Sequence, residues 1–107
     1  MNSKHKGNRF EREWAKKLKP YFPDVLTSRY ASREADDNGI DLVNTGDFKF
    51  QCKHIERQPN FRQVLNEIQG DGIKIVAHKM NNKGTIICMG EKDFLTLMET
   101  YINALPK

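Results

Sequence analysis

The sequence has few cysteines and no long apolar run, and both absences exclude whole classes of protein. Only Cys52 and Cys88 occur in 107 residues, and neither stands in a CxxC pair. Their separation does not match zinc-site spacing, so we expect two buried thiols in a reducing cytosol. No stretch approaches the ~18–20 apolar residues of a membrane span. The amino-terminal residues also lack the apolar segment of a secretory signal. These features predict a cytoplasmic protein without membrane contact.

The sequence also lacks internal repeats, low-complexity tracts and linkers, which favours a single domain over residues 1–107. Hydrophobic residues make up 37% of the chain and charged residues 30%. Six phenylalanines, three tyrosines and one tryptophan supply the large side chains of a core, so we expect a folded domain and not a disordered segment.

The net charge of +4 is unevenly distributed along the chain. Residues 1–33 contain nine Lys or Arg and three Asp or Glu, a net charge of +6, whereas residues 34–107 have a net charge of −2. A basic front on a small domain favours a polyanionic partner, and nucleic acid is the first candidate. The alternative is a lysine-rich helix whose charges only face solvent.

The hydrophobic periodicity predicts an α/β protein with the element order α-β-β-β-α-β-β-α. This pattern corresponds to a mixed β-sheet core flanked by helices. Residues 1–8 are expected to form a flexible basic arm, and residues 32–39 a polar loop. The expected helices are 9–18, a segment from about Pro59 to just before Gly70, and 91–105, and the expected strands are 25–31, 40–43, 48–53, 74–78 and 85–89.

An acidic residue lies within the apolar stripe of the first expected helix. At ~100° per residue, Phe10, Trp14 and Leu18 define a stripe centred near ~60°. Glu11 falls at ~100°, within the stripe, whereas Glu13 falls at ~300°, outside it. Glu11 is therefore expected to point inward, where an unpaired charge is costly. It would need either an internal salt bridge to Arg or Lys, or a bound cation.

Two expected strands carry further polar residues that packing alone does not require. Asp41 interrupts the apolar run Ile40-Asp41-Leu42-Val43, either as a turn-capping residue or as a ligand. Gln51 and Lys53 share one face of the strand 48–53, with Cys52 on the opposite face. This face is either a solvated strand face or part of a site.

Taken together, these residues fit a hard-cation site with an amine beside it. Carboxylate and amide oxygens suit Mg²⁺. Such an ion polarises a phosphodiester, and a neighbouring lysine can orient or deprotonate the attacking water and stabilise charge in the transition state. The sequence therefore predicts phosphodiester hydrolysis at Glu11, Asp41, Gln51 and Lys53.

The spacing of these residues resembles the PD-(D/E)xK nuclease superfamily, and most closely the archaeal-type Holliday junction resolvases that also occur in phages. The likeness covers most of the chain. It begins at Lys6-Gly7, followed after three residues by Glu11-Arg12-Glu13, and continues through Ile40-Asp41-Leu42-Val43 to Gln51-Cys52-Lys53. The family usually has Glu where this chain has Gln51, and a Gln variant is familiar in Mrr-like restriction nucleases.

The resemblance implies a restriction-endonuclease-like fold, a Mg²⁺ cofactor that Mn²⁺ can replace, and roles in DNA recombination and repair in a bacterial, archaeal or phage setting. It places the metal on Glu11, Asp41, Gln51 and the backbone carbonyl of Cys52, with Lys53 positioning the nucleophilic water. It implies a 5′-phosphate product and, because one chain has one site, a homodimer for symmetric cutting. The residues expected to contact DNA are Lys4, Lys6, Arg9, Arg12, Arg29, Ser32 and Arg33.

Two alternatives remain open at this stage. A Mrr-like restriction or general DNA nuclease would use the same chemistry on another target, and Gln51 favours it. A catalytically inert DNA-binding module on a nuclease fold would bind DNA without metal-dependent cleavage. The presence of Glu11, Asp41 and Lys53 argues against the inert module.

Overall fold

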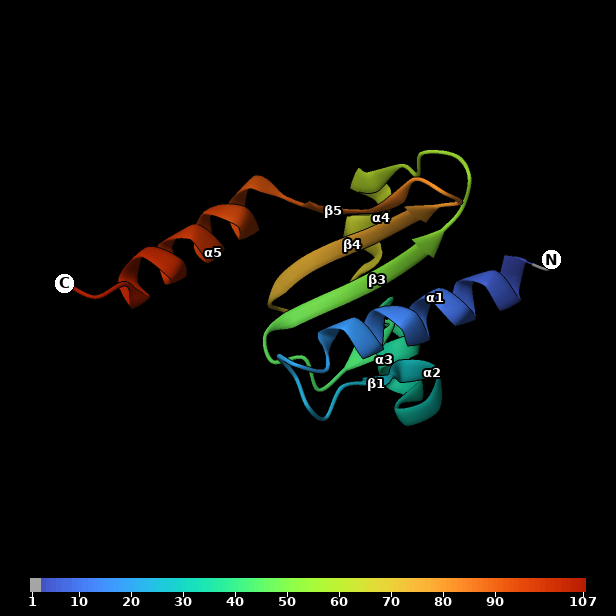
Figure 1. Cartoon of the computed structure of the whole chain (residues 1–107), viewed down its shortest axis with the longest axis horizontal. Helices are drawn as coiled ribbons and strands as arrows, with labels where there is room; N and C mark the ends of the chain where they lie inside the picture. Colours follow the sequence, from blue (N-terminus) through green and yellow to red (C-terminus); the bar gives the residue numbers. More distant parts are fainter. Residues whose placement is uncertain (1–2) are drawn as a thin grey trace.

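Three strands form the central sheet of the protein in a computed structural model that describes residues 3–107 (Figure 1). β3 (Phe48–His54) pairs in parallel with β4 (Ile73–Met80), and β4 pairs antiparallel with β5 (Gly84–Met89). The strand order is β3-β4-β5, so β4 is the central strand. Its apolar run Ile75-Val76-Ala77 is accordingly buried on both faces. The expected α/β architecture with a mixed sheet is confirmed.

Helix α1 (Ser3–Leu18) packs against β3 on one face of the sheet (Figure 1). Its buried residues Phe10 and Ala15 contact the core beside Phe50 and Cys52. The helix begins at Ser3, so the expectation of an arm over residues 1–8 was wrong for residues 3–8, and residues 1–2 lie outside the described part. An ion pair between Lys6 and Glu56 joins the first part of α1 to the chain just after β3. This contact helps to hold residues 3–8 in the helix and explains why they do not form an arm.

Two short strands and two short helices lie between α1 and β3. β1 (Leu26–Thr27) pairs antiparallel with β2 (Leu42–Val43), and α2 (Ser28–Ala31) and α3 (Arg33–Asp37) connect them. The expected strand 25–31 and loop 32–39 are therefore largely helical. Ser32 helps to explain why the expected loop is helical, because its hydroxyl accepts a hydrogen bond from the Ala35 N–H at 3.2 Å and so caps α3.

Helix α4 (Phe61–Glu67) forms the crossover that a parallel pair of strands requires. Its amino terminus is capped by Asn60, whose side chain accepts from the Gln63 N–H at 3.1 Å. Phe61 contacts the ring of His78 edge-on, and this places α4 on the face of the sheet opposite α1. Val64 is buried as the periodicity predicted.

The last helix, α5 (Glu91–Ala104), extends away from the sheet along the longest axis of the molecule (Figure 1). It contributes no buried residue to the core. Both cysteines are free, and Cys52 is buried as expected, but Cys88 is only partly buried because β5 is an edge strand. Among residues 3–107, no helix is both long and apolar enough to cross a membrane.

Candidate active site

The four residues predicted for catalysis lie together in one pocket of about 270 Å³ at the outer edge of β3. Helix α1 supplies Glu11, the segment before β2 supplies Asp41, and β3 supplies Gln51 and Lys53. These elements meet here because the Asp41 N–H donates to the Phe50 carbonyl at 2.8 Å, which holds the start of β2 against β3. The pocket is lined by Lys4, Gly7, Asn8, Glu11, Arg29, Asp41, Gln51, Cys52, Lys53, His54 and Ile55.

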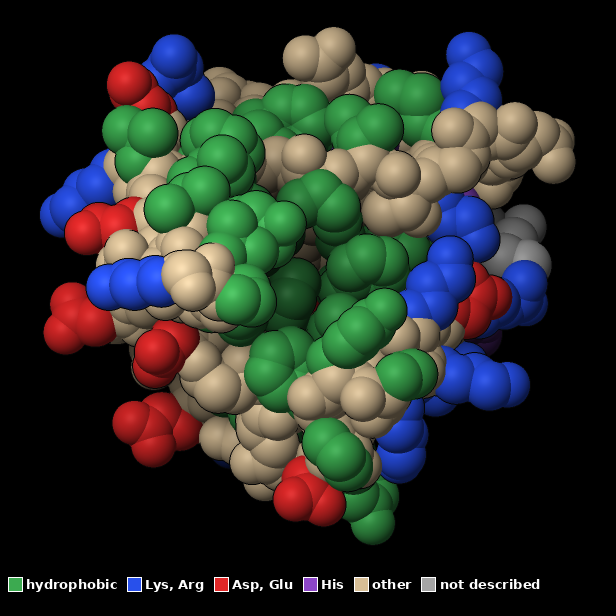
Figure 2. All heavy atoms as spheres, turned by 60° about the vertical axis from the view of Figure 1, so that its left-hand side comes forward, with side chains coloured by type: hydrophobic (Ala, Val, Ile, Leu, Met, Phe, Trp, Pro, Cys, Tyr) green, Lys and Arg blue, Asp and Glu red, His purple; other side chains and the backbone are tan. Residues whose placement is uncertain are grey.

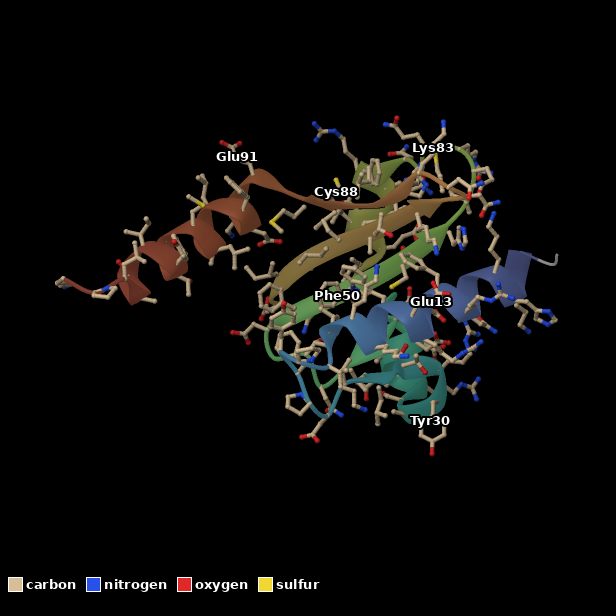
Figure 3. The ribbon with its side chains drawn as sticks, in the orientation of Figure 1. Glu13, Tyr30, Phe50, Lys83, Cys88 and Glu91 are labelled. Atoms are coloured by element: carbon tan, nitrogen blue, oxygen red, sulfur yellow. The ribbon has the colours of Figure 1, made fainter. Side chains whose placement is uncertain are left out.

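Glu11 is buried, with 5% of its surface exposed, as the helical wheel predicted. Its carboxylate accepts from Nη2 of Arg29 at 3.2 and 3.4 Å. The internal salt bridge considered as an alternative is therefore present, and it lies within the pocket itself. Glu13 instead lies on the exposed side of α1, where it pairs with Lys79 at 3.2 Å (Figure 3).

Asp41 is held by the backbone of the strand beside it. Its Oδ2 accepts a hydrogen bond from the Cys52 N–H at 2.7 Å. Burial, assisted by the charge of Glu11, raises the pKa of Asp41 to about 7, although the Cys52 N–H and Lys53 oppose the shift. The Glu11 carboxylate therefore lies close enough to disfavour the ionised form of Asp41, a cost that a bound cation would remove.

Gln51 leaves one buried oxygen without a partner. Its Nε2 donates to the Gly39 carbonyl at 3.1 Å, and because a carbonyl can only accept, this bond fixes which end of the amide is nitrogen. The other end, Oε1, is buried and has no hydrogen-bond partner among the described residues. A buried polar atom without a partner is unusual and costs free energy. Oε1 is thus an unused oxygen donor in a residue that lines the pocket.

Lys53 and His54 complete the pocket at the end of β3. Lys53 is partly buried and close enough to Asp41 to lower the pKa of that carboxyl group. Only 10% of the His54 side chain is exposed. Its ring contacts Phe10 edge-on, and its Nε2 lies 2.9 Å from Oδ1 of Asn81. The contact with Phe10 of α1 covers this side chain at the end of β3.

The donor set fits a hard divalent cation. Asp41, Glu11 and Oε1 of Gln51 offer oxygens, and the Cys52 carbonyl faces the same edge of β3 as the N–H that binds Asp41. The Cys52 thiol is no competitor, because burial raises its pKa well above the ordinary value and keeps it protonated. Within residues 3–107, no three His, Cys, Asp or Glu side chains form a metal cluster, so the third ligand here would have to be an amide or a carbonyl.

The residues expected to contact DNA are not all in one place. Lys4 and Arg29 line the pocket, and Arg9 and Arg12 are exposed on α1. Lys6 is held by Glu56, and its hydrogen bond lowers the pKa of that carboxyl group. Ser32 and Arg33 lie farther along the chain: Ser32 caps α3, and Arg33 is exposed beside Asp37 in the same helix.

Two features of the site were missed by the sequence reading. Asn8 lines the pocket three residues before Glu11, on the same face of α1. Helical spacing would have found it had the helix been extended beyond Arg9. The Gly39 carbonyl, which anchors Gln51, carries no sequence signal of its own because it is a backbone group brought in by tertiary folding.

Replacing Arg29 by alanine is expected to destabilise the protein, because it leaves the buried Glu11 carboxylate without its partner. Arg29 is about half exposed, with 47% of its side chain accessible, so the expected loss is modest, about 1–2 kcal/mol in the free energy of unfolding. Urea unfolding at neutral pH measures it. Arg33→Ala, which removes an almost fully exposed cation, is the matched control. Equal losses in both variants would contradict a specific role for the Glu11–Arg29 pair.

In comparisons with known proteins, no family model, no curated protein sequence and no solved structure matches this chain significantly.

Proposed function

We propose that this protein is a Mg²⁺-dependent endonuclease that cuts branched DNA, with the four-way Holliday junction as its main substrate. The observation that carries the proposal is the buried Oε1 of Gln51, which lacks a partner among the described residues and belongs to a pocket that also contains two carboxylates and a lysine. A structural role explains the Nε2 end of this amide but not the Oε1 end. A cation bound to Oε1 would account for that end, and the Nε2 bond to Gly39 would hold the amide in the orientation that this requires.

In this proposal Asp41, Gln51 and the carbonyl of Cys52 hold Mg²⁺, for which Mn²⁺ can substitute, and Glu11 binds the ion or its water. When bound, the cation polarises the phosphodiester and offsets negative charge as the bond breaks. Lys53 positions the attacking water through its Nζ and stabilises charge on the phosphate oxygens. The water oxygen bonds to phosphorus while the bond to the 3′ oxygen breaks, which yields a 5′-phosphate and a 3′-hydroxyl.

The cations around the pocket suit a polyanionic substrate. Lys4 and Arg29 line it, and Arg9 and Arg12 lie on the same helix as Glu11. Backbone contacts of this kind bind DNA without reading its sequence. Lys6, Ser32 and Arg33 remain secondary candidates, because none of the three lines the pocket. We propose a restriction-endonuclease-like core and a cytoplasmic location. Because each chain has one site, we also propose a homodimer for paired cuts.

The proposal is tested by incubating the purified protein with a four-way junction, a flap, a linear duplex and a single strand, with Mg²⁺ or EDTA. Preferential Mg²⁺-dependent cutting of the junction supports it. Equal cutting of duplex and junction would favour a Mrr-like or general nuclease, an alternative that the presence of Gln51 also favours. Binding without any metal-dependent cutting would identify an inert DNA-binding module.

Lys53→Ala is expected to reduce the rate of junction cleavage by about 10²–10⁴-fold while leaving DNA binding nearly unchanged, because the Lys53 ammonium acts on the reacting water and phosphate. Lys49→Ala is the matched control, since Lys49 lies on the same face of β3 outside the pocket. Single-turnover cleavage in Mg²⁺ gives the rates. Similar losses in the two variants would contradict the role assigned to Lys53.

A further inference from the structure

A second groove, of about 500 Å³, lies between α1 and the segment that forms β1 and α2. The residues that α1 and the turn after it contribute are spaced three, four and seven positions apart, so they share one face of the helix: Arg12, Ala15, Lys16 and Lys19. Ala15 is buried, whereas the three cations are exposed. One side of the groove is therefore a basic rim above a small residue, and we call it the basic groove.

Tyr30 of α2 supplies an exposed aromatic ring to the basic groove. The residue is 85% exposed, and Figure 3 shows its side chain projecting from α2 away from the body of the protein. Its ring makes no aromatic contact, and its hydroxyl no hydrogen bond, with any of the residues that the structure describes. The ring is therefore free to stack on a planar group of a ligand.

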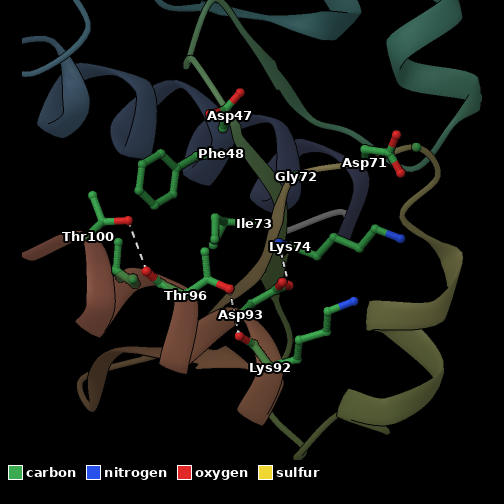
Figure 4. A pocket seen from close by; sticks show the side chains of 12 residues that line it. Asp47, Phe48, Asp71, Gly72, Ile73, Lys74, Lys92, Asp93, Thr96 and Thr100 are labelled. Carbon is green, nitrogen blue, oxygen red and sulfur yellow. Dashed lines mark hydrogen bonds between the residues drawn. The ribbon is translucent and has the colours of Figure 1, made fainter.

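The charges of the basic groove suit a polyanion. No acidic side chain lines it, and none of its three cations forms an ion pair within residues 3–107. By contrast, the larger groove of about 680 Å³ beside the first turns of α5 is lined by Asp47, Asp71 and Asp93 as well as by lysines (Figure 4). Figure 2 shows charge separated over the surface, with Lys and Arg gathered mainly along the right-hand edge and most Asp and Glu along the left. Acidic residues repel phosphate, so the basic groove is the better site for a nucleic-acid strand.

We propose that the basic groove binds an unpaired nucleotide of the DNA substrate, with the base stacked on Tyr30 and the neighbouring phosphates against Arg12, Lys16 and Lys19. The buried side chain of Val25 gives the groove an apolar lining that suits the sugar and the face of the base. The basic rim runs about 10 Å along α1 at 1.5 Å per residue, a length that accommodates the backbone of a few nucleotides. Cations beside an aromatic platform hold single strands without reading their sequence.

The basic groove adjoins the candidate active site. On α1, Glu11 lines the active-site pocket and the next residue, Arg12, lines the groove. On α2, Arg29 and Tyr30 are divided between the two in the same way. One DNA strand can therefore occupy both places.

This inference rests on the proposed nuclease function and explains how branched DNA is preferred. A base within an intact duplex is stacked on both of its neighbours and cannot offer a face to Tyr30. Unstacking costs less where a base is already unpaired, as it can be at a branch point or in a flap. The basic groove thus favours DNA with unpaired nucleotides over a linear duplex.

The test measures binding in EDTA, where Mg²⁺-dependent cleavage does not occur, by fluorescence anisotropy of two labelled single strands. One is an oligothymidylate of about 12 nucleotides, within the range of single-strand site sizes, and the other is the same backbone without bases. Tyr30→Ala should weaken binding of the oligothymidylate about 5–150-fold and leave binding of the abasic strand unchanged, because only the first loses a stacking contact. Tyr30→Phe keeps the ring and should bind both strands like wild type. Tyr21→Ala is the matched control, since Tyr21 is 73% exposed and lies outside the groove.

The basic rim is tested by the salt dependence of binding to the oligothymidylate. Lys16→Ala should reduce the slope of log K against log salt concentration by about 0.7, the value for one phosphate contact on a single strand. Lys17→Ala is the matched control, since Lys17 is the exposed neighbour that does not line the groove, and its slope should stay near that of wild type.

Several results would overturn the proposal. One is a wild type that binds neither strand, and another is a Tyr30→Ala variant that binds the oligothymidylate as wild type does. Equal losses in Tyr30→Ala and Tyr21→Ala, or equal losses on the two strands, would also contradict stacking on Tyr30. Any of these results can occur in a protein that cuts junctions in Mg²⁺, so the proposed function would survive them. Conversely, stacking on Tyr30 in a protein that cuts no DNA would support the basic groove and contradict the nuclease proposal alone.

Discussion

Replacing Asp41 by asparagine is expected to abolish Mg²⁺-dependent cleavage and at the same time to stabilise the metal-free protein above pH 7. Asparagine keeps the shape of the side chain and, through Oδ1, the hydrogen bond from the Cys52 N–H. It removes a charge that burial and Glu11 disfavour. Cleavage should fall about 100-fold or more, because the variant loses the carboxylate that the proposed mechanism assigns to the cation.

The expected gain in stability follows from the raised pKa. Asp41 titrates near pH 7 in the folded protein, against an ordinary value of 3.8 that applies to the unfolded chain. Between these values the folded state holds a proton that the unfolded chain has released, so the free energy of unfolding falls as the pH rises through this window. The loss is complete above pH 7, and the Asp41→Asn variant would avoid it, a difference of roughly 2–4 kcal/mol.

Chemical unfolding in EDTA between pH 4 and pH 8 measures this difference. Wild type should lose stability across the range relative to Asp41→Asn, and Mg²⁺ should restore stability at pH 8 in wild type only. Asp24→Asn, at an exposed acidic position, should follow wild type. If Asp41→Asn has the same free energy of unfolding as wild type at every pH, ionisation of the Asp41 carboxyl group does not destabilise the metal-free protein. That result would contradict the need for a cation at this site.

Gln51→Glu is expected to lower the stability of the metal-free protein and to increase its response to Mg²⁺. The substitution replaces the Nε2 donor with an oxygen that faces the Gly39 carbonyl at about the same distance, 3.1 Å in wild type. It also adds a third carboxylate beside Glu11 and Asp41. An unsatisfied buried group of this kind costs about 2–4 kcal/mol. A divalent cation offsets the added charge, so Mg²⁺ should bind more tightly.

Thermal unfolding over a Mg²⁺ titration measures both effects in one experiment. In EDTA, the midpoint temperature of unfolding should be lower for Gln51→Glu than for wild type. Added Mg²⁺ should raise this temperature further in the variant than in wild type, and cleavage by the variant should reach its half-maximum at a lower Mg²⁺ concentration. Gln58→Glu, at an exposed position outside this pocket, is the control. An unchanged Mg²⁺ response would show that Gln51 is not a ligand, and the proposed metal site would lose its central residue.

Sequence periodicity located the site residues that belong to long regular elements. The two-residue alternation identified the strand 48–53, which the structure extends to His54, and the helical wheel placed Glu11 inside and Glu13 outside, because burial in such elements repeats with a fixed spacing. Periodicity failed over residues 25–39, where helices of four and five residues are too short to show a repeat.

What the sequence could not supply are contacts between groups distant along the chain. Nothing in the strand pattern indicated that the Gly39 carbonyl would bind Gln51, or that Arg29 would be the partner of Glu11. The periodicity predicted the helix 91–105 but not that its large apolar side chains would stay exposed, as they do in α5. Local spacing fixes which side of an element is apolar, whereas its partner is decided by the whole fold.

Gly39 also provides a means of recognising relatives of this protein. Its φ angle is +76°, and a Cβ at this position would stand 2.6 Å from the Glu67 carbonyl oxygen, so a larger residue would displace the backbone that holds Gln51. A homologue that keeps the site should therefore keep the glycine as strictly as the acid. The pattern Gly-x-Asp, nine intervening residues, then Gln-x-Lys thus describes the lineage more sharply than the acidic residues and lysine alone.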